Sequence, residues 1–179
     1  MTDYGLLAKQ IVSLAEVDAH WLPVLSNAAA LLWDALDDIN WAGFYLVDPA
    51  TVVGAGPSAG AEPGAIPSAH DSRTPELRLG PFQGKVACVR IPFGRGVCGT
   101  AAATKTSQLV EDVHQFPGHI ACDSASNSEV VVPIFKDSQV VGVLDIDSPS
   151  VARFTKEDLA GLEQVVKALE SCTNFSAFC

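Results

Sequence analysis

The sequence predicts an α+β fold, an antiparallel sheet with helices gathered on one of its faces. Apolar residues recur at three- and four-residue spacing through the first forty residues, which is typical of helices. Runs rich in β-branched and aromatic residues follow, and an amphipathic segment closes the chain. This order of elements is that of an α+β domain. Because 179 residues can bury one core but not two, we expect a single domain over residues 1–170.

The helices are predicted from apolar spacing and capping residues. Asp3 is a suitable N-cap for a first helix ending near Ala15. A second helix is predicted to start near Asp18, with Pro23 in its first turns, where a missing N–H costs little. The closing helix is predicted to start at Thr155, whose hydroxyl can cap it. Its apolar stripe consists of Leu159, Leu162, Val166 and Leu169.

Strands are predicted between these helices, at residues 41–47, 77–79, 86–91, 108–110, 130–135 and 139–146. Residues 136–138 are short and polar, which indicates a hairpin between the last two strands. A short helix is expected from about Val97, after a glycine-rich turn. Residues 50–75 are rich in Gly, Ala, Pro and Ser, so we expect a loop inserted between two strands. Residues 171–179 are interpreted as a C-terminal tail.

Composition excludes several classes of partner. The chain has 11 basic and 21 acidic residues, a net charge of −10, which disfavours binding to nucleic acid or to an anionic membrane. No apolar stretch approaches the roughly 20 residues that span a bilayer, and no secretory signal is recognisable. Five cysteines, an odd number, favour a reducing compartment over a disulfide scaffold. We therefore expect a soluble, acidic, cytoplasmic domain.

Three cysteines are candidates for chemistry. Cys122 lies in a polar segment where a thiol can ionise, whereas Cys88 falls in a predicted strand. Cys98 begins the short helix, whose N-terminus could lower the pKa of the thiol, although its apolar neighbours equally suit simple packing. His114 and His119 raise the alternatives of a zinc site or a base for Cys122. Because paired metal-ligand spacing is absent, we predict no metal.

Acidic residues form a second candidate site. Alternation along the strand 139–146 places Val141, Val143, Asp145 and Asp147 on one face, with Leu144 and Ile146 on the other. This pattern suits a polar pocket or a strand end in water. Glu129 precedes the neighbouring strand and could reach the same place in an antiparallel pair. Three converging carboxylates would bind a cation such as an ammonium group and raise one another's pKa values.

Three blocks of sequence carry a family resemblance. They are residues 79–88, residues 91–99 and residues 141–148. With the separations of Cys88, Cys98 and Cys122, they resemble free methionine-(R)-sulfoxide reductases, catalytic members of the GAF-domain family. The resemblance runs from about Tyr4 to Leu169. The segment 50–75 is longer than the family's usual connection, and the two cysteines of the tail lie outside its pattern.

The resemblance implies a GAF-like six-stranded antiparallel sheet flanked by helices, with no metal and no organic cofactor. It implies thiol-dependent reduction of free L-methionine-(R)-S-oxide, in defence against oxidative stress, through a cysteine sulfenic acid and an intramolecular disulfide. A thioredoxin-type dithiol protein would recycle the enzyme, and a homodimer is expected. By the resemblance the catalytic cysteine is Cys122, the resolving one Cys88 and an auxiliary one Cys98. Trp41 and Tyr45 would line the methyl-sulfur end of the substrate, and Glu129, Asp145 and Asp147 would hold the amino acid.

The sequence also allows other assignments. Cys98 could be the resolving cysteine, and Cys172 and Cys179 could act as a relay. GAF domains also serve as small-ligand sensors without catalysis, and the thiols of an interaction protein would merely pack. The sensor does not need three cysteines so placed, and the interaction protein leaves the acidic cluster without a purpose.

Overall fold

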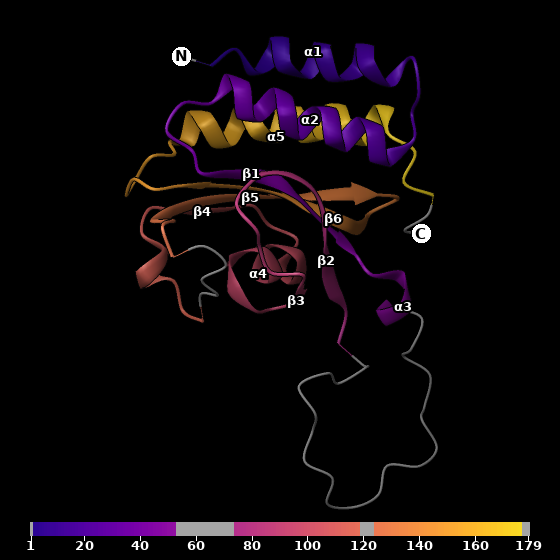
Figure 1. Cartoon of the computed structure of the whole chain (residues 1–179). Coiled ribbons are helices and arrows are strands. Elements are labelled where there is room, and N and C mark those ends of the chain that lie inside the picture. Colours follow the sequence, from indigo (N-terminus) through magenta and orange to yellow (C-terminus); the bar gives the residue numbers. More distant parts are fainter. Residues whose placement is uncertain (1, 53–73, 119–123, 177–179) are drawn as a thin grey trace, which may run out of the picture.

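The computed structural model describes residues 2–52, 74–118 and 124–176. It contains the predicted six-stranded sheet, in the order β3-β2-β1-β6-β5-β4 (Figure 1). Every neighbouring pair of strands is antiparallel, as predicted. The strands are β1 (Trp41–Val47), β2 (Glu76–Gly84), β3 (Arg90–Pro92), β4 (Gln108–Val110), β5 (Ser128–Lys136) and β6 (Gln139–Ser148).

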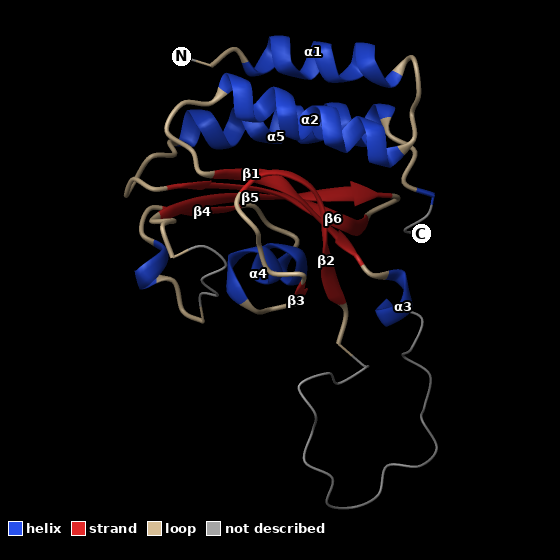
Figure 2. Ribbon diagram, in the orientation of Figure 1, coloured by secondary structure: helices blue, strands red, loops and turns tan. Residues whose placement is uncertain are grey.

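Helices cover both faces of the sheet (Figure 2). Helices α2 (Trp21–Ala35) and α5 (Lys156–Cys172) lie on one face, with α1 (Tyr4–Ala15) stacked on them away from the sheet, and α4 (Gly96–Thr104) lies beneath the opposite face. The prediction that the helices gather on one face is therefore wrong for α4. Its small side chains allow close approach to the sheet, and they bury a second apolar face. Two shorter elements, α3 (Pro49–Val52) and the 3-10 turn η1 (Val113–Gln115), lie in connections.

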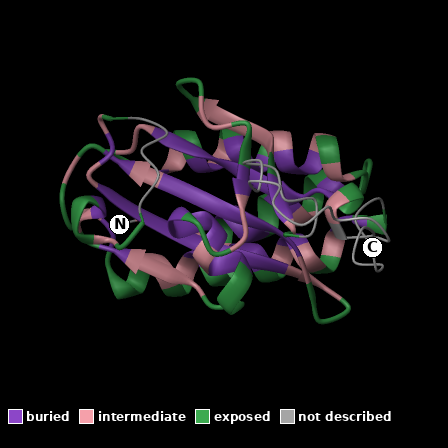
Figure 3. Ribbon diagram, turned by 90° about the horizontal axis from the view of Figure 1, so that it is seen from below, coloured by how far each residue is buried: buried purple, intermediate pink, exposed green. Residues whose placement is uncertain are grey.

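Two hydrophobic clusters result from this arrangement. The first joins the sheet to α2 and α5 and these two helices to α1, and it includes Phe44 and Leu144. The second lies on the α4 side and includes Trp41, Tyr45 and Val143. Successive residues of a strand point to opposite faces, so β1 and β6 supply both clusters. The central strands are accordingly buried along most of their length (Figure 3).

The N-caps of α1 and α5 are the residues predicted from the sequence, whereas the N-cap of α2 is not. Asp3 caps α1, and Thr155 and Asp158 form a capping box at α5, as Thr155 predicted. The start of α2 differs from the prediction, because Asp18 accepts a hydrogen bond from the His20 N–H and so turns the chain before the helix. The His20 ring then caps α2 by accepting from the Leu22 N–H. The helix therefore begins at Trp21.

The predicted hairpin between β5 and β6 is present, with an irregularity after its turn. Asp137 and Ser138 both have positive φ, as a tight turn of the primed type requires. The register then shifts, because Ile134 pairs with Gly142 whereas Phe135 pairs with Val140. The unpaired Val141 consequently joins the first cluster. The prediction that Val141 shares a face with Asp145 is wrong for this reason.

Residues 86–89 form a connection between β2 and β3 instead of the predicted strand. Val86 is 88% exposed and Val89 65% exposed, so the apolar run does not become buried in the sheet. Cys88 consequently lies in this connection. β2 runs on through Gly84, well past the strand predicted at 77–79, because its second half pairs with β1.

The two segments predicted to be irregular are described only in part. The insert 50–75 connects β1 to β2, and residues 53–73 of it lie outside the described residues. Helix α5 continues to Cys172, and beyond it Phe175 is buried in the first cluster. Within the described ranges, no helix is long and apolar enough to cross a membrane.

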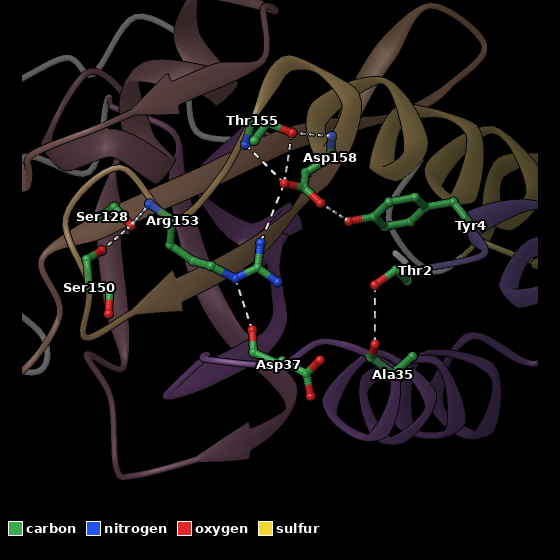
Figure 4. A network of polar contacts seen from close by, with 9 residues as sticks. All are labelled: Thr2, Tyr4, Ala35, Asp37, Ser128, Ser150, Arg153, Thr155 and Asp158. Atoms are coloured by element: carbon green, nitrogen blue, oxygen red, sulfur yellow. Dashed lines mark hydrogen bonds and ion pairs between the residues drawn. The ribbon is translucent and has the colours of Figure 1, made fainter.

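A polar network ties the ends of four elements together (Figure 4). Asp158 accepts from the hydroxyl of Tyr4 at 2.5 Å and lies 3.4 Å from the guanidinium of Arg153. Arg153 donates from Nε to the carbonyl of Asp37, and its backbone N–H donates to the Ser128 hydroxyl. Ser128 is the first residue of β5, so the network fixes the end of the sheet at which the acidic residues lie.

Candidate functional site

Three acidic side chains converge where β5 and β6 pair. Glu129 lies opposite Asp147 in the ladder, and Asp145 lies opposite Val131 on one side and Gly43 of β1 on the other. Glu129 and Asp145 are each only 6% exposed, whereas Asp147 is half-buried. The predicted antiparallel approach of Glu129 to the two aspartates is therefore confirmed. Because both are buried, Glu129 and Asp145 do not belong to a strand end in water, the other interpretation of the alternating pattern.

Helix α4 adds a thiol to these carboxyl groups. The sulfur of Cys98 lies 3.8 Å from Oε1 of Glu129, and Cys98 itself is 3% exposed. One ligand-type atom from each of Cys98, Glu129 and Asp145 lies within 4.8 Å of the others. The sequence left open whether Cys98 merely packs, and the structure places it in direct contact with the acids. Within the described residues, Oδ1 of Asp145 is buried without a hydrogen-bond partner.

Burial and mutual repulsion change the protonation of this cluster. Burial, then the charges of Asp145 and Asp147, raise the pKa of Glu129 well above its usual value. Burial also raises the pKa of Asp145, to about 6, against hydrogen bonds from Cys98 and Glu129 that lower it. Asp145, with a pKa of about 6, can therefore ionise at neutral pH, while the surroundings of Glu129 favour its protonated form. Such a pair can offer a proton and a negative charge side by side in a buried site.

The same environment keeps Cys98 neutral. Burial first, then the charges of Asp145 and Glu129, raises the pKa of the Cys98 thiol well above its usual value. The alternative in which the helix N-terminus acidifies Cys98 is therefore wrong, because burial among carboxylates outweighs the helix dipole. Cys98 acts in this site as a weak hydrogen-bond donor to carboxyl oxygens.

An aromatic wall lies on the same face of the sheet. Trp41, Gly43 and Tyr45 are every second residue of β1 and so lie on one face. The rings of Trp41 and Tyr45 stack with their centroids 5.7 Å apart and an interplanar angle of 23°. Trp41 also stacks on Phe82 of β2, at 5.2 Å and 14°, and its ring N–H donates to the carbonyl of Lys85. Burial, then the charge of Asp145, raises the pKa of Tyr45, so its hydroxyl stays protonated. The structure thus brings both predicted aromatic residues to the face that carries the acids.

Two residues of this wall were missed in the sequence. Gly43 separates Trp41 from Tyr45, and a Cβ there would lie 2.3 Å from the Cβ of Phe82 and 2.7 Å from the ring of Trp41. Phe82 supplies the flat surface against which Trp41 is held. The glycine within an aromatic run of β1 was the available signal, because a residue without a side chain allows such close approach.

The other predicted cysteines are placed differently. Cys88 takes part in a disulfide, whereas Cys98 and Cys172 are free thiols. Cys122 lies outside the described residues, as does His119. Whether Cys122 meets the acidic cluster therefore stays a prediction. His114 is exposed, with Nε2 at 3.1 Å from the side-chain oxygen of Asn127, and it takes no part in the cluster.

The cluster of Cys98, Glu129 and Asp145 could hold either of two kinds of cation. Its ligand atoms are close enough together for a divalent metal, and its single ionised carboxylate also suits an ammonium group. The raised pKa values of Glu129 and Cys98 favour the ammonium group, because a metal binds the deprotonated forms of these side chains. The absence of metal stays a prediction.

Comparisons with known proteins show which family this chain resembles. The GAF domain profile matches residues 20–172. The free methionine-R-sulfoxide reductase of Escherichia coli is 48% identical over 167 residues, which cover 93% of this chain and 86% of that protein. The solved structure of fRMsr from Staphylococcus aureus, in its reduced form, is 48% identical and superposes with a TM-score of 0.79, covering 97% of both chains.

A third relative was solved with a ligand. The free methionine-R-sulfoxide reductase of Neisseria meningitidis, in complex with its substrate, is 40% identical and superposes with a TM-score of 0.78, covering 97% of this chain and 90% of that one. The likeness in sequence and in fold thus extends over nearly the whole chain. This chain belongs to the GAF-domain family and, within it, to the free methionine-R-sulfoxide reductases.

Proposed function

We propose that this protein reduces free L-methionine-(R)-S-oxide to L-methionine. The names of its relatives from Escherichia coli and Neisseria meningitidis support this activity, and the latter was solved with its substrate bound. One observation of this chain carries the proposal. A buried acidic pair, Glu129 and Asp145, shares a sheet face with the stacked rings of Trp41 and Tyr45.

The acidic pair suits the ammonium group of a free amino acid. Asp145 is largely ionised at neutral pH, and one of its oxygens lacks a hydrogen-bond partner among the described residues. An ammonium group would supply both the missing donor and the compensating charge, which a buried carboxylate needs. Methionine residues within a peptide lack that group, so their binding would leave Asp145 buried without a cation. This cost would select the free amino acid.

Glu129 is suited to act as the acid. The oxygen of a sulfoxide leaves readily only when it is protonated, and a carboxylic acid kept neutral by burial can donate that proton. The raised pKa of Glu129 favours the protonated form that this step needs. Trp41 and Tyr45 would hold the methyl group of the substrate against their rings, which fixes the epimer at sulfur.

Cysteine chemistry completes the reaction. The thiolate of Cys122 would attack the sulfoxide sulfur, and methionine would leave as the oxygen passes to Cys122 as a sulfenic acid. The thiol of Cys88 would condense with the sulfenic acid, forming a disulfide and releasing water. A dithiol protein of the thioredoxin type would then reduce this disulfide by exchange. The disulfide at Cys88 and the free thiol of Cys98 support this division of roles.

The working state of the protein is proposed from the same resemblance. We expect a homodimer, which light scattering after gel filtration would test. Reduction by a dithiol protein fits the reducing compartment that the odd number of cysteines favours, which is the cytoplasm.

A coupled assay tests the activity. Thioredoxin, its reductase and NADPH are mixed with the protein and free L-methionine-(R)-S-oxide, and NADPH consumption is followed. We expect turnover that is abolished in Cys122→Ser and retained in the matched control Cys172→Ser, which removes another free thiol. Tight binding of the ligand without turnover would instead make the protein a sensor, and failure of both would end the proposal.

Mapping of the disulfide tests the roles of the cysteines. One equivalent of substrate is added to the reduced protein without reductant, and the peptides are analysed by mass spectrometry. We expect Cys88 joined to Cys122, both in the wild type and in Cys98→Ser. A dominant link between Cys98 and Cys122 would reverse the assignment, and a link to Cys172 or Cys179 would show a relay through the end of the chain.

A further inference from the structure

The connection between β2 and β3 exposes two valines on either side of Cys88. Val86 is 88% exposed and Val89 is 65% exposed, which makes them two of the three most exposed large apolar residues in the described ranges. Cys88 between them is half-buried, against the second hydrophobic cluster, and takes part in a disulfide. An exposed apolar pair beside a redox-active sulfur indicates a contact surface.

Both ends of this connection are held by the fold. The N–H of Leu79 in β2 donates to the carbonyl of Val89 at 3.0 Å. The ring N–H of Trp41 in β1 donates to the carbonyl of Lys85 at 3.2 Å. The backbone that carries the two valines is therefore fixed to the sheet at either end, and a partner would not have to order it on binding.

We propose that Val86 and Val89 form the docking surface for the dithiol protein that reduces the disulfide at Cys88. This inference rests on the proposed function, because only a catalytic cycle through that disulfide calls for a reductant. Thiol–disulfide exchange requires the attacking sulfur to approach in line with the S–S bond. A protein that brings its thiol to Cys88 must cover the side chains next to it, and these are the two valines.

Charge near the docking surface is also distinctive. Residues 85–90 include two basic residues, Lys85 and Arg90, and no acidic one, although the whole chain has a net charge of −10. Arg90 lies 3.5 Å from Glu76. A partner with apolar side chains around its reactive thiol fits the two valines. An acidic partner would be repelled less here than over the rest of the acidic surface.

Two successive thiol–disulfide exchanges would reduce the disulfide at Cys88. The thiolate of the partner attacks the sulfur of Cys88, a new S–S bond forms, and the second sulfur of the old disulfide leaves as a thiolate. The partner's other thiol then attacks the mixed disulfide and releases Cys88 as a thiolate. The partner is oxidised to its disulfide, the protein gains two electrons, and water protonates the released thiolates.

The double variant Val86→Ser/Val89→Ser tests the surface. Turnover of free L-methionine-(R)-S-oxide is measured with a bacterial thioredoxin at varied concentration, and separately with dithiothreitol, which needs no docking surface. We expect the KM for thioredoxin to rise about tenfold or more, with dithiothreitol-dependent turnover unchanged within about twofold. The control is Val17→Ser/Val151→Ser, since these valines are 88% and 59% exposed elsewhere.

The outcomes separate this inference from the proposed function. An unchanged KM for thioredoxin, or an equal loss with both reductants, would overturn the docking surface while leaving the reductase activity in place. No turnover of wild-type protein with either reductant would instead overturn the proposed function. A thioredoxin lacking its second thiol provides a direct readout, since we expect it to be trapped on Cys88, more slowly in the double variant. Trapping at another cysteine would contradict the proposal.

Discussion

The thiol of Cys98 donates a hydrogen bond to Oε1 of Glu129 across 3.8 Å, and so joins helix α4 to strand β5 inside the protein. This bond lowers the pKa of Glu129, against the larger effects of burial and of two aspartates, which raise it. Cys98 therefore adjusts the acidity of the carboxyl group that we propose as the proton donor. Cys98 can therefore serve the site as a hydrogen-bond donor to Glu129 without acting as a nucleophile.

Replacing Cys98 by alanine should shift the pH dependence of turnover. Loss of the S–H donor raises the pKa of Glu129 further, so the alkaline limb of kcat/KM should move to higher pH in Cys98→Ala. In Cys98→Ser the hydroxyl can still donate, and the limb should stay close to that of the wild type. An identical shift in both variants, or one in the control Cys172→Ala, would show that packing is responsible.

Substrate affinity should fall in mild acid. Asp145 must be ionised to bind an ammonium group, and its pKa is about 6. We therefore expect the KM for free methionine sulfoxide to rise about tenfold per pH unit below pH 6. In Asp145→Asn the KM should be high at every pH and should lack this inflection. Exposed Asp137→Asn serves as the control, and a wild-type KM that is flat from pH 5 to 8 would contradict a role for Asp145 as the anion.

The unliganded protein should gain stability when Asp145 is replaced. The pKa of Asp145 is raised from 3.8 to about 6 by folding, so the folded state binds a proton more tightly than the unfolded state. The stability that this proton supplies is complete below about pH 4 and is lost as the pH rises through 6. The free energy of unfolding of Asp145→Asn minus that of the wild type should therefore increase by on the order of 2 kcal/mol as the pH is raised from 4 to 7.5.

Urea unfolding at several pH values would measure this difference. Only the change with pH matters, since the Asn side chain alters hydrogen bonds equally at all pH values. A difference between variant and wild type that stays constant from pH 4 to 7.5 would mean that Asp145 has an ordinary pKa.

A methyl group at position 43 should disrupt the aromatic wall. The Cβ of Gly43→Ala would lie 2.3 Å from the Cβ of Phe82 and 2.7 Å from the ring of Trp41, so strand β2 and this ring must move. We expect a loss of about 2 kcal/mol or more in unfolding free energy and a higher KM for the substrate. Gly5→Ala is the matched control, because its Cβ meets nothing closer than 3.4 Å. Equal stability of the two alanine variants in thermal unfolding would refute this account.

The network around Asp158 should contribute to the stability of the whole domain. The burial of Asp158 would raise its pKa, but hydrogen bonds from Tyr4 and Thr155, with the charge of Arg153, hold the pKa below its usual value. Asp158→Asn should cost about 2 kcal/mol at pH 7, while exposed Glu157→Gln should cost little. The difference should vanish as the pH falls through the lowered pKa of Asp158. If the loss of unfolding free energy in Asp158→Asn did not depend on pH, altered packing and not the charge of Asp158 would be its cause.

Several elements could be predicted because their causes are local. Asp3 and Thr155 cap the helices that follow them, and the polar turn 136–138 specifies the hairpin of β5 and β6. Alternation along β6 placed Asp145 and Asp147 together, since a regular strand turns successive side chains to opposite faces. These predictions succeeded wherever a few neighbouring residues determine the backbone.

Other predictions failed where distant contacts decide. Residues 86–89 have the composition of a strand, but they form a connection in which Val86 and Val89 stay exposed. Val141 changes face because the β5–β6 register shifts, which the alternation of residues alone cannot show. The position of α4 beneath the sheet, and with it the contact of Cys98 with Glu129, depends on which apolar faces are left uncovered.

The sequence by itself determined the class of fold, the acidic residues that share a strand face and the family to which the chain belongs. Only the tertiary structure decided that Cys98 meets Glu129, that Phe82 supports Trp41, and that Glu129 and Asp145 are buried deeply enough for their pKa values to rise. The physical reason is the range of the interactions. Caps, turns and alternation act between residues close in the chain, whereas burial and the pKa values that follow from it depend on the whole packed molecule.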